Sequence, residues 1–110
     1  MNEHKILTID VHELKQRMDR NSDICLIDVR EDYEWQNYRI PQARHIPKGE
    51  LAARIKEETS DLAEPVYLYC QGGVRSLAAA DTLIQMGYQE VYSVNAGIAG
   101  WAMAGYAIDK

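Results

Sequence analysis

The segment with the clearest chemical potential begins at a cysteine and runs through a glycine pair to an arginine. Its residues, here called the cysteine segment, are Cys70, Gln71, Gly72, Gly73, Val74, Arg75 and Ser76. The glycine pair lets the backbone curl so that several amide N–H groups point inward, a geometry that binds anions. The helical pattern that follows adds a partial positive charge at its N-terminus, and the Arg75 guanidinium adds a full one. The segment therefore predicts an anion-binding loop around a nucleophilic sulfur.

These features favour the thiolate of Cys70 over its thiol. A free cysteine has a pKa of about 8.5, and a helix N-terminus or a nearby arginine lowers that pKa. Because the thiolate is the nucleophilic form, we expect Cys70 to be ionised and exposed to solvent. The alternative is that Cys70 is a small apolar residue that closes a strand, with Gly72-Gly73 as an ordinary turn. The glycine pair, the arginine and the start of the predicted helix all follow Cys70 within a few residues, and this combination favours a nucleophilic cysteine.

Strands and helices alternate around this segment. Short, nearly continuous runs of β-branched and aromatic residues are typical of strands buried on both faces of a parallel sheet. With a weaker run that suits an edge strand, the predicted strands are 24–29, 66–70, 91–94 and 6–9. Apolar residues at helical spacing predict helices over 11–18, 50–57, 75–86 and 98–104, the third with a stripe of Leu77, Ala80, Leu83 and Ile84. The sequence thus predicts an α/β fold, with a small parallel β-sheet core and helices on both faces, in one domain over residues 1–110.

Other polar residues follow a predicted strand end, where open parallel sheets bind their ligands. Asp28 ends the strand over 24–29, and we expect its carboxylate to accept backbone hydrogen bonds and organise the adjacent loop. Arg30 is expected to pair with one of the acidic residues that follow it, Glu31, Asp32 and Glu34. Cys25, inside the same apolar strand, is expected to pack as a small hydrophobe.

The cysteine segment and three further motifs resemble the rhodanese family. Residues 26–31 (LIDVRE) resemble the family's first core strand with its Asp-Val-Arg signature, and residues 39–47 (RIPQARHIP) resemble its His-Ile-Pro-Gly-Ala…Ile-Pro segment. Residues 95–101 (NAGIAGW), followed by 104–106 (AGY), resemble its C-terminal ending. The four motifs stand in the family's order along nearly the whole chain. The departures are Tyr38-Arg39, where Gly-His is usual, and Gln42 and Ala96, where Gly is usual.

The resemblance implies a sulfurtransferase with Cys70 as its nucleophile and no cofactor. The thiolate would attack the outer sulfur of a donor such as thiosulfate, release sulfite and hold a persulfide. A thiophilic acceptor, which is cyanide in assays or a cellular thiol that could belong to a partner protein, would then remove the sulfur. The backbone amides of residues 71–75 would stabilise these anions, and Arg75 would hold the anionic donor. Asp28, Arg30 and Ser76 would support the site.

Two other functions are the alternatives. The first is a cysteine phosphatase or arsenate reductase, but such phosphatases place one residue more between cysteine and arginine than the four found here. A shorter loop leaves less room for a tetrahedral oxyanion and favours sulfur chemistry. The second is a non-catalytic rhodanese-like binding or regulatory module. Such modules usually lack the cysteine, whereas this chain retains both it and the glycines.

Composition limits the kinds of partner the protein can bind and the cell compartment in which it is expected. A balance of 12 Lys+Arg against 17 Asp+Glu gives a net charge of −5, which argues against nucleic acid or an anionic membrane as the main partner. No apolar stretch approaches the roughly 20 residues of a membrane span, and the N-terminus lacks an apolar signal core, so we expect a cytoplasmic protein. Cys25 and Cys70 are too few for a disulfide scaffold. His4, His12 and His45 are scattered, so no metal site is expected.

Overall fold

A five-stranded sheet forms the centre of the protein. The computed structural model describes residues 4–110. The strands are β1 (Ile6–Ile9), β2 (Cys25–Asp28), β3 (Arg44–His45), β4 (Val66–Tyr69) and β5 (Val91–Val94). Their order is β1-β5-β4-β2-β3, and all four neighbouring pairs are parallel. The predicted parallel sheet, with β1 as an edge strand, is confirmed.

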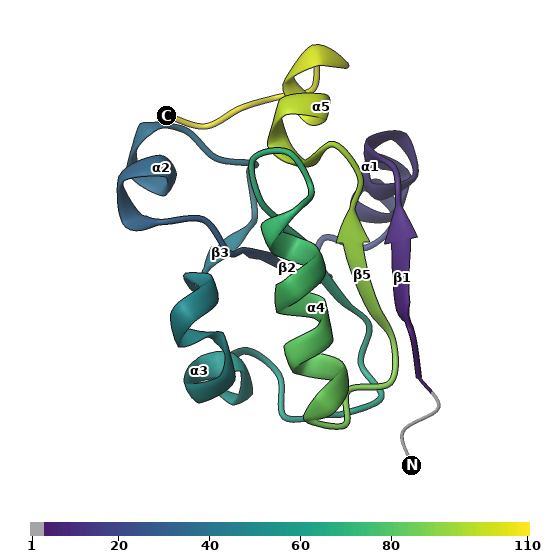
Figure 1. Ribbon diagram of the computed structural model, residues 1–110. Coiled ribbons are helices and arrows are strands. Elements are labelled where there is room, and N and C mark those ends of the chain that lie inside the picture. The colour runs from purple at the N-terminus through teal and green to yellow at the C-terminus, as the bar shows by residue number, and fades with distance from the viewer. Residues whose placement is uncertain (1–3) are drawn as a thin grey trace.

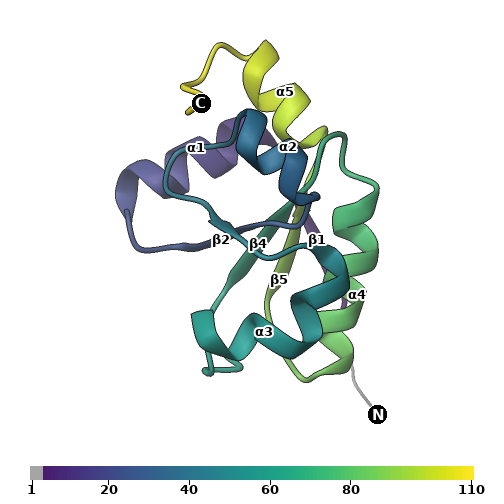
Figure 2. The same cartoon turned by 90° about the vertical axis from the view of Figure 1, so that its left-hand side faces the viewer.

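Helices cover both faces of this sheet. They are α1 (Val11–Arg20), α2 (Asp32–Asn37), α3 (Leu51–Glu58), α4 (Arg75–Gln85) and α5 (Gly97–Met103), with a 3-10 turn over Lys48–Glu50 before α3. The apolar side chains of α3 and α4 pack in one buried cluster and those of α1 and α5 in another, on opposite sides of the sheet (Figures 1 and 2). The predicted α/β architecture is therefore confirmed. Within residues 4–110, no helix combines the length and apolar character needed to cross a membrane.

Two elements have no counterpart among the predicted ones. The helix α2 buries none of its residues, so its sequence carries no apolar periodicity. The strand β3 has two residues, which is too short for an alternating pattern. Both elements owe their place to tertiary contacts, because β3 pairs with the end of β2 and α2 contacts the cysteine segment.

The helix α4 turns a different face towards the sheet from the one predicted. Its buried residues are Ser76, Ala79, Ala80, Leu83 and Ile84. Leu77 is 42% exposed, so its expected place in the buried stripe is wrong. The small side chains of the first turns are buried instead, and the hydroxyl of Ser76 lies 3.6 Å from Sγ of Cys70, the residue after β4.

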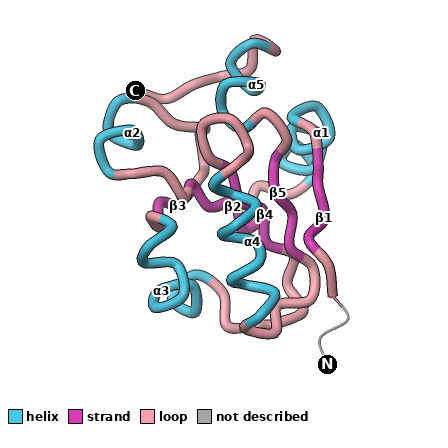
Figure 3. The backbone as a smooth tube through the Cα atoms, in the orientation of Figure 1, coloured by secondary structure: helices cyan, strands magenta, loops and turns pink. Residues whose placement is uncertain are grey.

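The carboxyl ends of the parallel strands lie at one end of the molecule, and the cysteine segment follows one of them, β4. Figure 3 shows the loop between β4 and α4 at this end, with α2 on one side of it and the start of α5 on the other. This is the end of an open parallel sheet at which ligands bind. The fold therefore places the cysteine segment where the sequence analysis expected it.

Two of the departures from the rhodanese pattern adopt the backbone conformation that glycine favours. Gln42 has a φ of 73° and Ala96 a φ of 63°, both in the left-handed region. A residue with a Cβ pays about 1–2 kcal/mol for this conformation. Both residues are exposed.

Candidate active site

Cys70 directly follows β4, the central strand, whose neighbours in the sheet are β5 and β2. The residue is only 1% exposed, so the prediction of a solvent-exposed sulfur is wrong for this conformation. The reason is the fold of the cysteine segment, which returns over the sulfur so that the N–H of Gly73 donates to Sγ at 3.1 Å.

Hydrogen bonds to Sγ favour the thiolate in spite of this burial. Burial is the largest single influence on the pKa of Cys70 and raises it. The Ser76 hydroxyl and the amides of Ser76, Gly73 and Gly72 act in the opposite direction, and together they bring the pKa below its ordinary value. The lowered pKa agrees with the sequence-based expectation. The hydroxyl of Ser76, rather than the guanidinium of Arg75, is the main group that lowers the pKa of Cys70.

The first turn of α5 holds the cysteine segment from the other side. The N–H groups of Ile98 and Ala99 donate to the carbonyl oxygens of Cys70 and Gln71, each at 3.0 Å. Gly97 makes this approach possible, because a Cβ at its position would lie 2.3 Å from the Cys70 carbonyl oxygen. Its φ of 53° also suits glycine. The path of the backbone around Cys70 is thus fixed by main-chain contacts with α5.

Ser93 is a site residue that the sequence analysis missed. Its Oγ lies 2.7 Å from Oγ of Ser76, and Ser76 Oγ lies 3.6 Å from Sγ of Cys70. Ser76 and Ser93 are 0% and 1% exposed. The available signal was a hydroxyl within the apolar run over 91–94, but the run alone does not reveal which residue lies across from it.

Arg75 is not a free anion-binding group in this structure. Its Nη1 and Nη2 donate to Oε1 and Oε2 of Glu34 at 2.7 and 2.9 Å, which joins the start of α4 to α2. The hydrogen bond from Arg75 is the main cause that lowers the pKa of Glu34 to about 2. An anion that bound to Arg75 would therefore compete with Glu34 for the guanidinium.

Asp28 and Arg30 form a buried pair, each with a fully buried side chain. The expected pairing of Arg30 with Glu31, Asp32 or Glu34 is wrong, because the backbone turn after β2 folds the guanidinium back onto Asp28 at 2.9 Å. Asp28 also accepts the backbone N–H of Arg30 at 2.8 Å, so the expected hydrogen bond from the adjacent backbone is confirmed. Arg30 extends this support to α2 by donating to the carbonyl oxygen of Tyr38 at 2.6 Å.

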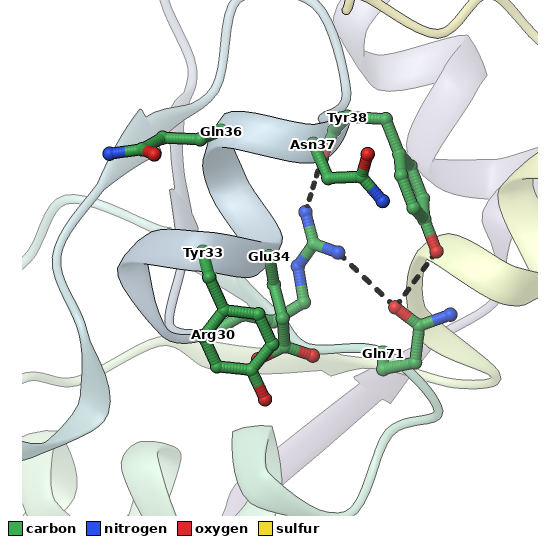
Figure 4. A pocket seen from close by; sticks show the side chains of 7 residues that line it. All are labelled: Arg30, Tyr33, Glu34, Gln36, Asn37, Tyr38 and Gln71. Atoms are coloured by element: carbon green, nitrogen blue, oxygen red, sulfur yellow. Dashed lines mark hydrogen bonds between the residues drawn. The ribbon is translucent and has the colours of Figure 1, made fainter.

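A pocket of about 500 Å³ lies between α2 and the cysteine segment (Figure 4). Oε1 of Gln71 forms part of its wall and accepts hydrogen bonds from Nη1 of Arg30 at 3.2 Å and from the hydroxyl of Tyr38 at 3.1 Å. Cys70 is not among the lining residues, so the pocket adjoins the cysteine segment without reaching the sulfur. The lining residues are Arg30, Tyr33, Glu34, Gln36, Asn37, Tyr38 and Gln71.

Cys25 lies too far from Cys70 to act as its partner thiol. It is in register with Val66, the first residue of β4, whereas Cys70 follows the last residue of that strand. At about 3.3 Å per residue the offset is roughly 13 Å, and a disulfide needs Cα atoms within about 7 Å. Burial is the main cause that raises the pKa of Cys25 to about 12. Its side chain packs against the apolar cluster under α3 and α4, as predicted.

Comparison with known proteins assigns the family. Residues 10–104 match the model of the rhodanese-like domain, and the fold and the four motifs agree with that match. The chain belongs to the rhodanese-like family.

The individual proteins that resemble this chain carry different names. The chain is 46% identical over 76 residues to the Uncharacterized protein YqhL of Bacillus subtilis, covering 69% of this chain and 59% of that protein. It is 35% identical over 100 residues to a protein of Allochromatium vinosum named Sulfurtransferase, covering 91% of this chain and 92% of that one. The crystal structure of a thiosulfate sulfurtransferase from Pseudomonas aeruginosa matches with a TM-score of 0.87 and 26% identity, covering 94% of this chain but only 20% of that one.

Proposed function

We propose that the protein is a sulfurtransferase that moves sulfane sulfur through a persulfide on Cys70. The donor is thiosulfate or a similar small anion, and the acceptor is a thiol of a small molecule or of a partner protein. The observation that supports this most directly is the Gly73 N–H at 3.1 Å from a sulfur whose pKa is lowered. The similarity to a protein named Sulfurtransferase over 92% of its length supports the same class of reaction. We place the reaction in the cytoplasm, where thiols such as the two free cysteines of this chain stay reduced.

The proposed reaction has two displacement steps. The Cys70 thiolate attacks the outer sulfur of thiosulfate, a new S–S bond forms, the donor's S–S bond breaks, and sulfite leaves with the electron pair of that bond. The outer sulfur of the persulfide carries the negative charge. The acceptor thiolate, or cyanide in an assay, then attacks this outer sulfur, and Cys70 leaves as the thiolate. The covalent intermediate divides one difficult transfer into two easier ones.

The cysteine segment stabilises the anions in both steps. The amides of Gly72, Gly73 and Ser76 lower the pKa of the resting thiol. They are directed at Sγ, which carries the charge before the first displacement and again when Cys70 leaves as the thiolate in the second. Arg75 binds the donor by charge-assisted hydrogen bonds once it exchanges the carboxylate of Glu34 for the oxygens of thiosulfate. The same exchange breaks the ion pair that joins α2 to the start of α4.

The pocket beside Gln71 provides a place for the acceptor. Its volume of about 500 Å³ exceeds what cyanide needs, and its phenols and amides suit a polar organic thiol. We propose that the acceptor rests against Tyr38 and Gln71 while its sulfur approaches the persulfide.

The test is detection of the intermediate on the purified protein. After treatment with thiosulfate, mass spectrometry of the peptide containing Cys70 should show one added sulfur, and cyanide should remove it. Cys70→Ser should abolish thiosulfate-dependent formation of thiocyanate, whereas the matched change Cys25→Ser should leave it intact. An added sulfur on Cys25 alone, or full turnover by Cys70→Ser, contradicts the mechanism. Hydrolysis of an aryl phosphate in place of sulfur transfer would indicate the phosphatase alternative.

A non-catalytic binding module is the second candidate, and two observations favour it. Cys70 is 1% exposed, and Arg75 is already paired with Glu34. If the sulfur stays covered in solution, iodoacetamide should leave Cys70 unmodified in the folded protein and modify it after denaturation. Modification of the folded protein that thiosulfate prevents would support the enzyme instead.

A further inference from the structure

Two buried hydroxyls connect the nucleophile to the neighbouring strand. Ser76 Oγ lies 3.6 Å from Sγ of Cys70 on one side and 2.7 Å from Oγ of Ser93 on the other. Ser76 belongs to the first turn of α4 and Ser93 to β5, so the chain of three polar atoms crosses from helix to sheet. With Ser76 and Ser93 at 0% and 1% exposure, the protein rather than solvent provides the environment of these groups.

The direction of the hydrogen bonds in this chain depends on the charge of the sulfur. A neutral thiol donates its proton to Ser76 Oγ, and the Ser76 hydroxyl is then free to donate to Ser93. A thiolate can only accept, so the Ser76 hydroxyl turns towards Sγ. The oxygen of Ser76 then accepts a hydrogen bond from the Ser93 hydroxyl. Hydrogen bonds in such a chain polarise one another, so the bond from Ser76 to the thiolate is stronger when Ser93 donates to Ser76.

We propose that Ser93 is a positioning residue that stabilises the Cys70 thiolate through Ser76 and holds the Ser76 hydroxyl in the orientation that donates to the sulfur. Its use in catalysis rests on the proposed sulfur transfer, but the effect on ionisation does not. No proton leaves through the chain, because the two hydroxyls only rotate while the thiol proton passes to solvent base.

The charged side chains near the hydrogen-bonded row of Cys70, Ser76 and Ser93 form ion pairs with one another. Arg75 from α4 is held by Glu34 from α2, and Arg30 is held by Asp28 after β2. The helix α5 carries no ionisable side chain in its sequence GIAGWAM. Tyr92 of β5, next to Ser93, points to the opposite face of the sheet, as neighbouring residues of a strand do. A substitution at Ser93 therefore leaves these charges in place, and a change in thiol ionisation reports on the hydroxyl chain.

The test measures the ionisation of Cys70 in the full chain without a reagent that must reach it. Ultraviolet absorbance of the thiolate is followed against pH, and the signal of Cys70→Ser is subtracted to remove the tyrosines and Cys25. Ser93→Ala should move the midpoint to higher pH by about 0.5–1 unit, the size expected from one hydrogen bond. Ser93→Thr, which keeps the hydroxyl, should restore the midpoint.

A double-substitution comparison separates this role from a structural one. Ser76→Ala should raise the midpoint by at least as much as Ser93→Ala, and adding Ser93→Ala to it should cause no further rise. A folded Ser93→Ala protein with an unchanged midpoint would overturn the proposal, as would an equal further rise in the Ser76→Ala background. Thermal unfolding identifies the variants that are folded. If the midpoint shifts as expected while thiosulfate yields no persulfide, the proposed function fails and the hydroxyl chain stands.

Discussion

If Arg75 holds the anionic donor, as proposed above, then Glu34 competes with the donor for the guanidinium that it already occupies. The fall in the pKa of Glu34 from 4.5 to about 2 corresponds to about 3 kcal/mol at ~1.36 kcal/mol per pKa unit. The Arg75 side chain is 36% exposed, so solvent screening reduces the value of the pair to about 1–2 kcal/mol. We therefore expect Glu34→Gln to lower the KM for thiosulfate about 5–30-fold, the factor that corresponds to this free energy.

The assay is thiosulfate-dependent formation of thiocyanate, with KM and kcat determined separately. The matched control is Glu50→Gln, which removes the same charge from a carboxylate that pairs with Arg54 at 2.7 Å on α3. The control should leave KM unchanged, whereas Arg75→Ala should raise it. If Glu34→Gln leaves KM unchanged or raises it, Arg75 does not hold the donor and its pairing with Glu34 is structural.

The same pair gives a pH dependence of stability. Because the pKa of Glu34 is lower in the folded protein, its contribution is present above pH ~4.5 and is lost as the pH falls towards 2. Urea unfolding of the wild type should lose about 1–2 kcal/mol more than Glu34→Gln over this interval. Equal losses in the two proteins would show that the pair adds no net stability.

Three further substitutions test the frame around the site. Gly97→Ala should destabilise by about 2 kcal/mol or more, because its Cβ would lie 2.3 Å from the Cys70 carbonyl oxygen; wild-type urea stability and activity would contradict this close approach. Asp28→Asn should cost about 3–5 kcal/mol in urea unfolding, since it leaves the Arg30 guanidinium buried without its counter-ion; a cost under about 1 kcal/mol would mean that other groups suffice. Gln42→Gly should stabilise the protein by about 0.5 kcal/mol, because relief of the strain at a φ of 73° outweighs the added freedom of the unfolded chain. The measurement is a rise in Tm. A fall in Tm would show that the Gln42 side chain contributes more to stability than the strain costs.

The sequence by itself determined the strands and helices whose residues are buried at regular spacing, and it identified the cysteine segment that lies between β4 and α4. β2, β4 and β5 are short apolar runs because both faces of a central parallel strand are covered, and this pattern is local. The cysteine segment is also local, since the glycine pair and the start of α4 are neighbours of Cys70 in the chain. For the same reason the hydrogen bond that Asp28 accepts could be predicted, because its partner is the backbone N–H of Arg30 two residues away.

Tertiary structure alone decided which groups meet across the site. Glu34 and Arg75 are 41 residues apart, and Ser76 and Ser93 are 17 apart, so no spacing in the sequence reveals either pair. The path of the backbone at Cys70 also depends on a distant element, because the N–H groups of Ile98 and Ala99 in α5 hold the carbonyl oxygens of Cys70 and Gln71. Local patterns report whether a residue faces the core, but the identity of its partner depends on how distant elements pack. The residues next to Cys70 in the sequence therefore indicate the chemistry of the site. The ion pair of Arg75 with Glu34 and the hydrogen bond between Ser76 and Ser93 depend on the folded structure.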